Sequence, residues 1–279
     1  MQANTATVPP TAPPAAPTHH PSYYFQECDV VFLVGNTLYC LPIGTQTGSS
    51  DQNPIPVPNV TSEEFDRFLD YQLRHIVPRG NQEALTSILK VAHFLQFDEA
   101  QQMARQALEQ LPNFDHVTKL ILGLRTNIPD WVTAAFGALA LSASERTLTW
   151  PESELLGFGP YRALMEARWE IVMHRRRLAY SFPEMASHAA SCLDNFDCEW
   201  GWKTEWKAKV AMYLIHPDTP VLGMQVLTLL EATEMRDVND ECRTKMVNTI
   251  RRSGMLVYED TVIERALATL IPPTLSPRC

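Results

Sequence analysis

The sequence predicts an α+β fold, in which a small β element near the N-terminus is followed by many helices. Three observations support this prediction. Residues 29–41 are rich in β-branched and aromatic side chains on either side of Gly35 and Asn36. After Thr61 the spacing of apolar residues changes from about two to about 3.6 and stays helical to the C-terminus. Glycine is scarce, at 11 of 279 residues, which suits a mostly helical chain.

The composition excludes several classes of protein. Hydrophobic residues make up 45% of the chain, which is ordinary for a protein that buries a core. A formal net charge of −9 gives no general attraction for phosphate backbones, so a nucleic-acid partner is not expected. No apolar run approaches the ~20 residues of a membrane-spanning helix. At roughly 150 residues per domain, the length corresponds to about two domains.

The first 22 residues contain no Lys, Arg, Asp or Glu and are rich in Pro, Ala and Thr. Such a segment buries too little surface to offset its ordering entropy, so we expect a disordered tail. A polyproline ligand for an aromatic groove is the alternative. The tail has no signal-peptide pattern, so we expect a location in the cytoplasm or nucleus. There we expect free thiols at all six cysteines: Cys28, Cys40, Cys192, Cys198, Cys242 and Cys279.

The β element begins with a predicted hairpin over residues 29–41. Gly35 tolerates a positive φ and Asn36 tolerates it better than most residues, so the pair favours a tight turn between two strands. Residues 42–53 are polar and are expected to form a loop. Alternate prolines over residues 54–58 remove amide donors from one side of an extended chain, so a strand here can pair along one edge only.

Three helices are expected next. Thr61 and Glu64 have the spacing of a capping box at the start of the first helix, whose buried face carries Phe65, Phe68 and Leu69. The second helix is expected over residues 82–97. The third is expected to be capped by Asp98 and to end before Pro112.

Helical periodicity continues beyond these three helices. Further capping boxes are expected at Thr149 with Glu152 and at Ser181 with Glu184. The helices are expected near residues 117–124, 131–139 (entered through Pro129), 160–179, 200–215, 220–231, 238–252 and 259–271. The expected organisation is a tail over 1–22, a head over 23–112, a helical extension over 113–180 and a Cys- and Trp-containing helical region over 181–279.

The succession of segments resembles a BTB/POZ domain of the type abundant in fungi, in which a helical extension follows the domain. DVVFLVGNTLYC, SSDQNPIPVPNVTSEEFDRFLDY and ILKVAHFLQFDEAQQMARQALEQL resemble the domain itself. NIPDWVTAAFGAL and LTWPESELLGFGPYRALMEARWEIV resemble the extension, so the likeness covers about residues 23–180. The resemblance implies a protein–protein interaction module that binds a protein partner or oligomerises, with adaptor work in ubiquitin ligases or transcriptional complexes among its uses.

The chain departs from this family at one place. A BTB fold has a helical hairpin between its second and third strands, and that hairpin contributes to the homodimer surface. Here only about a dozen polar residues separate Leu41 from Pro54, and they carry no apolar stripe. We therefore expect an incomplete BTB/POZ-like head and no ordinary homodimer. A degenerate paralogue without partner binding is the alternative.

No motif of catalysis is found in the sequence. There is no G-x-S-x-G and no P-loop, and the Gly157-Phe158-Gly159 segment lacks the third glycine of a dinucleotide fingerprint. We therefore expect a protein that is not an enzyme, and we assign no catalytic or cofactor-binding residue. A hydrolase or transferase whose site is built from distant residues is a further hypothesis.

One group of residues has a metal-like spacing. Cys192 and Cys198 are separated by five residues, His188 precedes Cys192 by four, and Cys242 could supply a fourth ligand. Zinc favours four such ligands but usually includes a tight C-x2–4-C pair, which is missing here. Buried free cysteines are therefore preferred and no metal ligand is assigned. A zinc-binding regulatory protein that uses residues 185–275 is the alternative function.

Two further groups stand out. The basic run His174–Arg177 lies near the end of an expected helix, where cations complement the helix dipole. A nuclear-localisation or nucleic-acid patch is its alternative. Trp200, Trp202 and Trp206 are expected to pack in a core, and stacking on a base or cation is their alternative.

Overall fold

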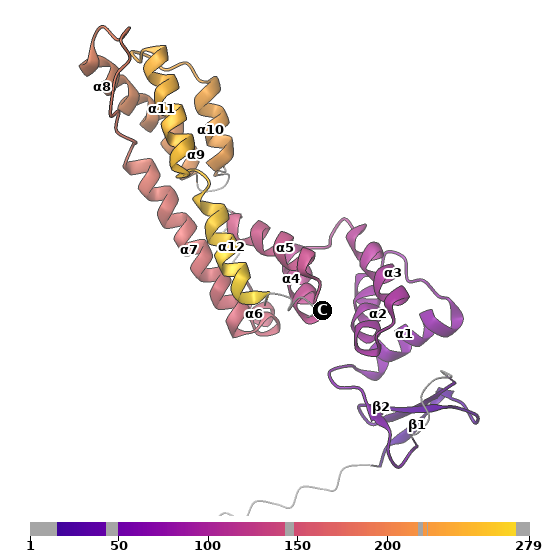
Figure 1. Ribbon diagram of the computed structural model, residues 1–279. Helices are drawn as coiled ribbons and strands as arrows, with labels where there is room; N and C mark the ends of the chain where they lie inside the picture. The colour runs from indigo at the N-terminus through magenta and orange to yellow at the C-terminus, as the bar shows by residue number, and fades with distance from the viewer. Residues whose placement is uncertain (1–15, 43–49, 143–147, 217–219, 222, 272–279) are drawn as a thin grey trace, which may run out of the picture. The chain divides into compact units, whose positions relative to one another are not determined.

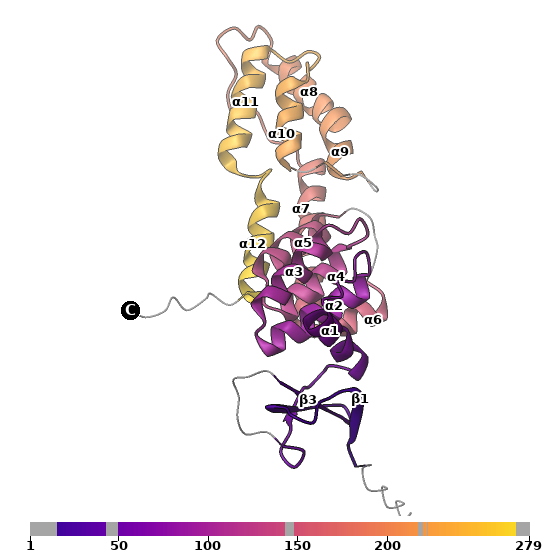
Figure 2. The same ribbon diagram turned by 90° about the vertical axis from the view of Figure 1, so that its right-hand side faces the viewer.

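The computed structural model describes residues 16–42, 50–142, 148–216, 220–221 and 223–271 (Figures 1 and 2). The chain divides into two compact units, residues 1–114 and 115–279, and each is described by itself. The observed architecture is a small mixed sheet with helices, followed by an all-α part, as the α+β prediction requires. Among the described helices, none has the length and apolarity that a membrane crossing requires.

The sheet of the first unit contains four strands in the order β1-β3-β2-β4. β2 (Val30–Val34) and β3 (Thr37–Leu41) form an antiparallel hairpin, and Gly35 has a φ of +60° in the turn between them. The predicted hairpin is therefore confirmed. β4 (Ile55–Pro56) pairs in parallel with β2 and lies at an edge of the sheet, as the alternate prolines predict.

The N-terminal prediction is wrong for residues 18–22. Thr18–Tyr24 form strand β1, which pairs in parallel with β3 and shifts register between His19 and Tyr24. Pro21 interrupts any alternation of apolar residues, so the sequence alone shows no strand pattern here. The strand is fixed by polar side chains instead, since the Tyr23 hydroxyl donates to Asp70 at 2.5 Å. Residues 1–15 of the expected tail lie outside the described residues.

The expected absence of a helical hairpin falls partly outside the described residues, because residues 43–49 are not among them. The part that is described is short: residues 50–53 form a turn closed by a bridge between Ser50 and Asn53. The chain then enters β4, and the Val57 N–H donates to the carbonyl of Leu33 at 2.9 Å.

Three helices follow the sheet along the chain: α1 (Ser62–Arg74), α2 (Gln82–Leu95) and α3 (Asp98–Glu109). The capping box is confirmed, because the Glu64 N–H donates to Thr61 Oγ1 and the Thr61 N–H donates to Glu64. Asp98 is not a cap; it is the first residue of α3, and Phe97 occupies the capping position without a side-chain bond. Phe65, which is fully buried, contacts Tyr39 of β3 edge-on and so joins α1 to the sheet.

The second unit is helical throughout its regular structure. The Thr149–Glu152 box is confirmed, since the Thr149 N–H donates to Glu152 at 2.8 Å. The elements are α4 (His116–Arg125), α5 (Pro129–Leu141), α6 (Trp150–Leu156), α7 (Phe158–Tyr180), α8 (Asn195–Glu205), the π-helix η1 (Trp206–Ala211), α9 (Met212–Leu214), α10 (Gly223–Ala232), α11 (Asp240–Ser253) and α12 (Tyr258–Leu270).

The predicted capping box at Ser181 and Glu184 is wrong. α7 ends at Tyr180, Ser181 is its C-cap, and residues 182–189 form no helix. The backbone of this segment bonds to side chains elsewhere in the unit instead of to itself. The Trp202 indole N–H donates to the carbonyl of Pro183 at 2.9 Å, and the Ala189 N–H donates to Cys242 Sγ at 3.1 Å.

Two apolar cores make up the second unit, and α7 belongs to both. Leu164 and Ile171 of α7 pack with α5 and α12, and Figures 1 and 2 show α7 and α12 side by side. Near its other end, Ala179 packs into the core formed by α8, η1, α10 and α11.

A buried ion pair joins α7 to α12. Arg175 donates two hydrogen bonds to Glu259, at 2.6 and 2.9 Å, and both side chains are 7% exposed. His174 bonds to the carbonyl of Met255 at 2.7 Å. The prediction of helix-end electrostatics is therefore wrong for His174 and Arg175, because their side chains bond to Met255 and Glu259 instead. Arg177 does lie in the last turn of α7, as predicted.

The ion pair gives a test of the fold. Glu259→Gln leaves the Arg175 guanidinium buried without its countercharge, so we expect the free energy of unfolding to fall by about 3–5 kcal/mol. Urea unfolding followed by circular dichroism measures the change. Glu166→Gln, which removes an exposed i,i+4 partner of Arg162, is the matched control and should leave stability unchanged. Equal effects of the two variants would contradict the role given to the buried pair.

Candidate metal centre

Four side chains of the second unit converge at one point. They are His188, Cys192, Cys198 and Cys242, and their ligand atoms all lie within 4.8 Å of one another. His188 Nδ1 lies 3.6 Å from Cys192 Sγ and 3.8 Å from Cys242 Sγ. Cys198 and Cys242 are buried, whereas His188 and Cys192 are partly exposed. The cluster therefore has a closed inner side and an open outer side.

Two helix N-termini place the two buried cysteines. Asp194 caps α8 by accepting from the N–H groups of Phe196 and Asp197, which fixes Cys198 in the first turn. Asn239 caps α11 in the same way and places Cys242 in its first turn. Two of the four side chains are therefore held at helix N-termini, where the positive end of the helix dipole lies.

Backbone N–H groups point at two of the sulfurs. The Ala189 N–H donates to Cys242 Sγ at 3.1 Å, and the Asn239 N–H donates to Cys198 Sγ at 3.4 Å. The Asn239 side chain also donates to the carbonyl of Ser191, next to Cys192. Bonds of this kind orient metal ligands and stabilise their charged form.

Burial works against a free thiolate at this cluster. The pKa of Cys198 is raised to about 12, and burial is the largest cause. The Asn239 N–H works in the opposite direction, and the neighbouring Cys192 and Cys242 add to the rise. Without a cation, Cys198 therefore stays protonated at neutral pH. A metal ion bound here has to displace that proton.

The geometry agrees with a tetrahedral ion. With a zinc–sulfur distance of about 2.3 Å and a zinc–nitrogen distance of about 2.0 Å, a tetrahedron separates two sulfurs by about 3.8 Å and a sulfur from a nitrogen by about 3.5 Å. The two distances from His188 are 3.6 and 3.8 Å, and every other pair lies within 4.8 Å. Shifts of about 1 Å or less would complete the site, so the four side chains could hold a metal ion.

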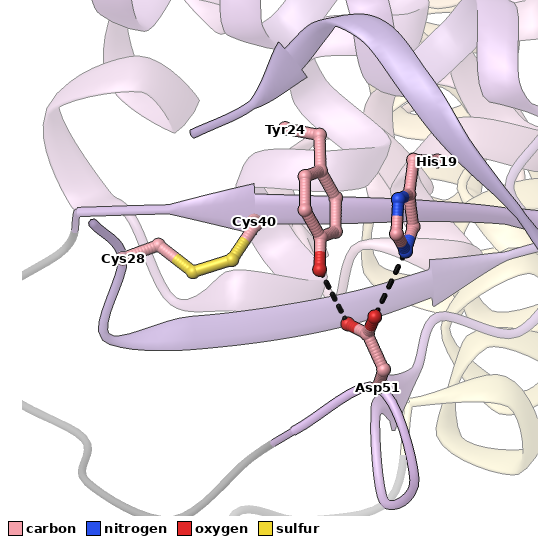
Figure 3. Close-up of a disulfide and its surroundings, with 5 residues drawn as sticks. All are labelled: His19, Tyr24, Cys28, Cys40 and Asp51. Carbon is pink, nitrogen blue, oxygen red and sulfur yellow. Dashed lines mark hydrogen bonds and ion pairs between the residues drawn. A yellow bond between two sulfur atoms is a disulfide. The ribbon is translucent and has the colours of Figure 1, made fainter. Parts of the chain in front are cut away.

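The expectation of six free cysteines is wrong for two of them. Cys192, Cys198 and Cys242 are free, but Cys28 and Cys40 form a disulfide with a Cα–Cα distance of 5.6 Å (Figure 3). A reducing compartment favours free thiols, but it does not decide which cysteines lie close together. The pairing of the hairpin brings the segment before β2 alongside β3 and so places Cys28 beside Cys40. Cys279 lies outside the described residues.

Beside the disulfide, Asp51 joins the turn before β4 to β1. Its carboxylate accepts from the Tyr24 hydroxyl at 2.7 Å and bonds to His19 Nε2 at 2.8 Å (Figure 3). The hydroxyl bond lowers the pKa of Asp51, and His19 contributes in the same direction. The two rings stack at 3.8 Å. This group holds a strand in place and presents no cluster of metal ligands.

The tryptophan prediction is confirmed for two residues and wrong for the third. Trp202 and Trp206 are fully buried, with their ring centroids 5.8 Å apart. Trp200 is 60% exposed, and the Lys203 ammonium lies 5.7 Å from its ring centroid.

Comparison of the chain with protein-family models, with curated proteins and with solved structures finds no match. The BTB/POZ resemblance therefore stays a prediction, carried by the residues quoted for it.

The cluster predicts a pH-dependent metal affinity. Each thiol that binds loses a proton. As the pH is lowered, the affinity for Zn²⁺ should therefore fall by about tenfold per pH unit for each proton displaced. Competition with a chromophoric chelator at pH 8, 7 and 6 measures this slope. An affinity that does not change over this range would show that the thiols are not the ligands.

Proposed function

We propose that the chain is a non-enzymatic protein-interaction protein whose C-terminal helical part is held together by a structural zinc ion. The observation that carries the metal part is the convergence of His188, Cys192, Cys198 and Cys242 within 4.8 Å. Three sulfurs and one imidazole form a ligand set that suits Zn²⁺ and disfavours the hard cations Mg²⁺ and Ca²⁺.

The number of ligands supports a structural ion. Catalytic zinc sites usually have three protein ligands and an open position, whereas structural sites have four. The four ligands here come from three segments: the connection after α7, the start of α8 and the start of α11. An ion would link a connection without helical structure to the two helices beside it.

The interaction part of the proposal has two supports. One is the BTB/POZ resemblance, which implies binding of a protein partner and adaptor work. The other is a group of exposed apolar side chains beside the metal cluster, namely Leu193 (102% exposed), Phe196 (75%) and Trp200 (60%). The three residues flank two of the cluster's cysteines in the sequence, and apolar side chains that are exposed together form interaction surfaces. Homodimerisation is not part of the proposal, because the family's dimer-forming hairpin is expected to be missing.

Cytoplasm or nucleus remains the proposed location. Zinc-binding thiols are compatible with either compartment, but both normally keep cysteines reduced. The Cys28–Cys40 pair would then be a disulfide that forms only under oxidation. Non-reducing electrophoresis of the protein from rapidly alkylated cells tests this. A pair that is fully oxidised in unstressed cells would contradict the location.

Metal analysis of the full chain tests the zinc proposal. We expect one Zn²⁺ per chain, and we expect Co²⁺ in its place to give the sulfur-to-metal absorption of a tetrahedral thiolate site. Cys198→Ser should lower the affinity for Zn²⁺ by at least about tenfold, because a ligand is lost. Ser191→Ala, beside a ligand but not a ligand itself, is the matched control.

A misfolded variant would give the same loss, so a second substitution is needed. Cys192→His replaces one zinc ligand by another and should keep a stoichiometric ion, with weaker thiolate absorption from Co²⁺. Metal-free protein that unfolds at the same temperature with and without Zn²⁺ would overturn the proposal.

The exposed side chains beside the cluster test the interaction proposal. In quantitative affinity capture from cells, the full chain should retain at least one protein in stoichiometric amount. Leu193→Ser combined with Trp200→Ser should lose that protein while keeping its Zn²⁺. The exposed Trp150→Ser variant is the matched control. Identical captured sets for all three proteins would contradict a role for this surface.

A further inference from the structure

A pocket of about 190 Å³ opens within the second unit, away from the metal cluster. It lies between the last residues of α5, the middle of α7 and the chain that follows α9. Ile171 and Leu214 are both buried in its wall, and Leu141 and Ile215 add further apolar surface. A cavity of roughly 150 Å³ is large enough for benzene, so this pocket admits an apolar group of that size.

The charged side chains that line the pocket in the described part of the chain are arginines. Arg168 and Arg176 line it from α7 and lie eight residues apart, which is about 12 Å along a helix. Arg175 also lines it, but its charge is offset by Glu259. Among the described residues that line the pocket, there is no Asp or Glu.

Arg176 is the residue whose charge is open to a ligand. Its side chain is exposed, and the structure gives it no ion pair within the described part of the chain. A guanidinium donates two parallel hydrogen bonds to a carboxylate, a geometry that a lysine lacks.

We infer that this pocket binds an apolar group that carries a carboxylate. The apolar part fits the floor formed by Ile171 and Leu214, and the carboxylate meets the Arg176 guanidinium at the rim. The carboxylate belongs either to a small free acid or to the C-terminus of a peptide. This inference goes beyond the proposed zinc site and does not depend on it, because no metal-cluster residue lines the pocket.

Isothermal titration of the full chain with benzoate and hexanoate tests the inference. We expect both acids to bind in the millimolar range or tighter, and benzyl alcohol to bind at least about tenfold more weakly because it lacks the charge. Inorganic phosphate should also bind at least about tenfold more weakly than benzoate, because it leaves the apolar floor empty.

Adjacent arginines provide the matched variants. Arg176→Gln should weaken benzoate binding by at least about tenfold, whereas Arg177→Gln changes an exposed arginine outside the pocket and should leave it unchanged. Both residues are exposed, so neither substitution should disturb the fold, and an unfolding temperature equal to that of the original protein verifies this. The inference would be overturned if neither acid binds, if benzyl alcohol binds as tightly as benzoate, or if the two variants weaken binding equally.

A second titration distinguishes a small free acid from a peptide C-terminus as the source of the carboxylate. It compares a peptide that ends in Phe with a free carboxylate and the same peptide amidated at its C-terminus. Displacement of benzoate by the free-acid form alone identifies a chain terminus as the ligand. Failure of both peptides, with benzoate still bound, identifies a small free acid. Equal displacement by both forms would count against recognition of the carboxylate.

Discussion

The connection between α7 and α8 is not helical, so its backbone N–H and C=O groups need hydrogen-bond partners from elsewhere in the second unit. The Trp202 indole N–H donates to the carbonyl of Pro183, and the Ala189 N–H donates to Cys242 Sγ. These bonds draw the connection onto α8 and α11. The same contacts bring an imidazole and three sulfurs together, so the candidate metal centre is a consequence of how this connection is held.

Local chemistry made much of the fold predictable from the sequence. A turn at Gly35 and a strand limited to one edge by its prolines follow from φ preferences and missing donors within a few residues. Strand β1 did not follow, because it depends on Asp70 of α1, far along the chain. The capping box predicted at Ser181 failed for the same kind of reason. Ser181 and Glu184 have the right spacing for a helix start, but the backbone after Ser181 bonds to distant side chains such as Trp202 and forms no helix.

The sequence named all four members of the cluster as possible ligands but favoured buried free cysteines, because the tight cysteine pair of a zinc site is missing. Nothing in the sequence placed the start of α11, with Cys242, beside the start of α8. Asn239 is another residue whose role at the site depends on the fold. It cannot ligate as a thiolate does, yet it caps α11 and directs its own N–H at Cys198, and only the fold shows both bonds. Side chains that support ligands leave weaker signals than the ligands themselves.

α7 runs without interruption through 23 residues, which is about 35 Å of helix, and each of the two cores of its unit packs around a different part of it. The two cores therefore share one backbone element whose hydrogen bonds run from one core into the other. A break within this helix, such as a proline in its middle, would remove hydrogen bonds between the two cores and alter the packing of both.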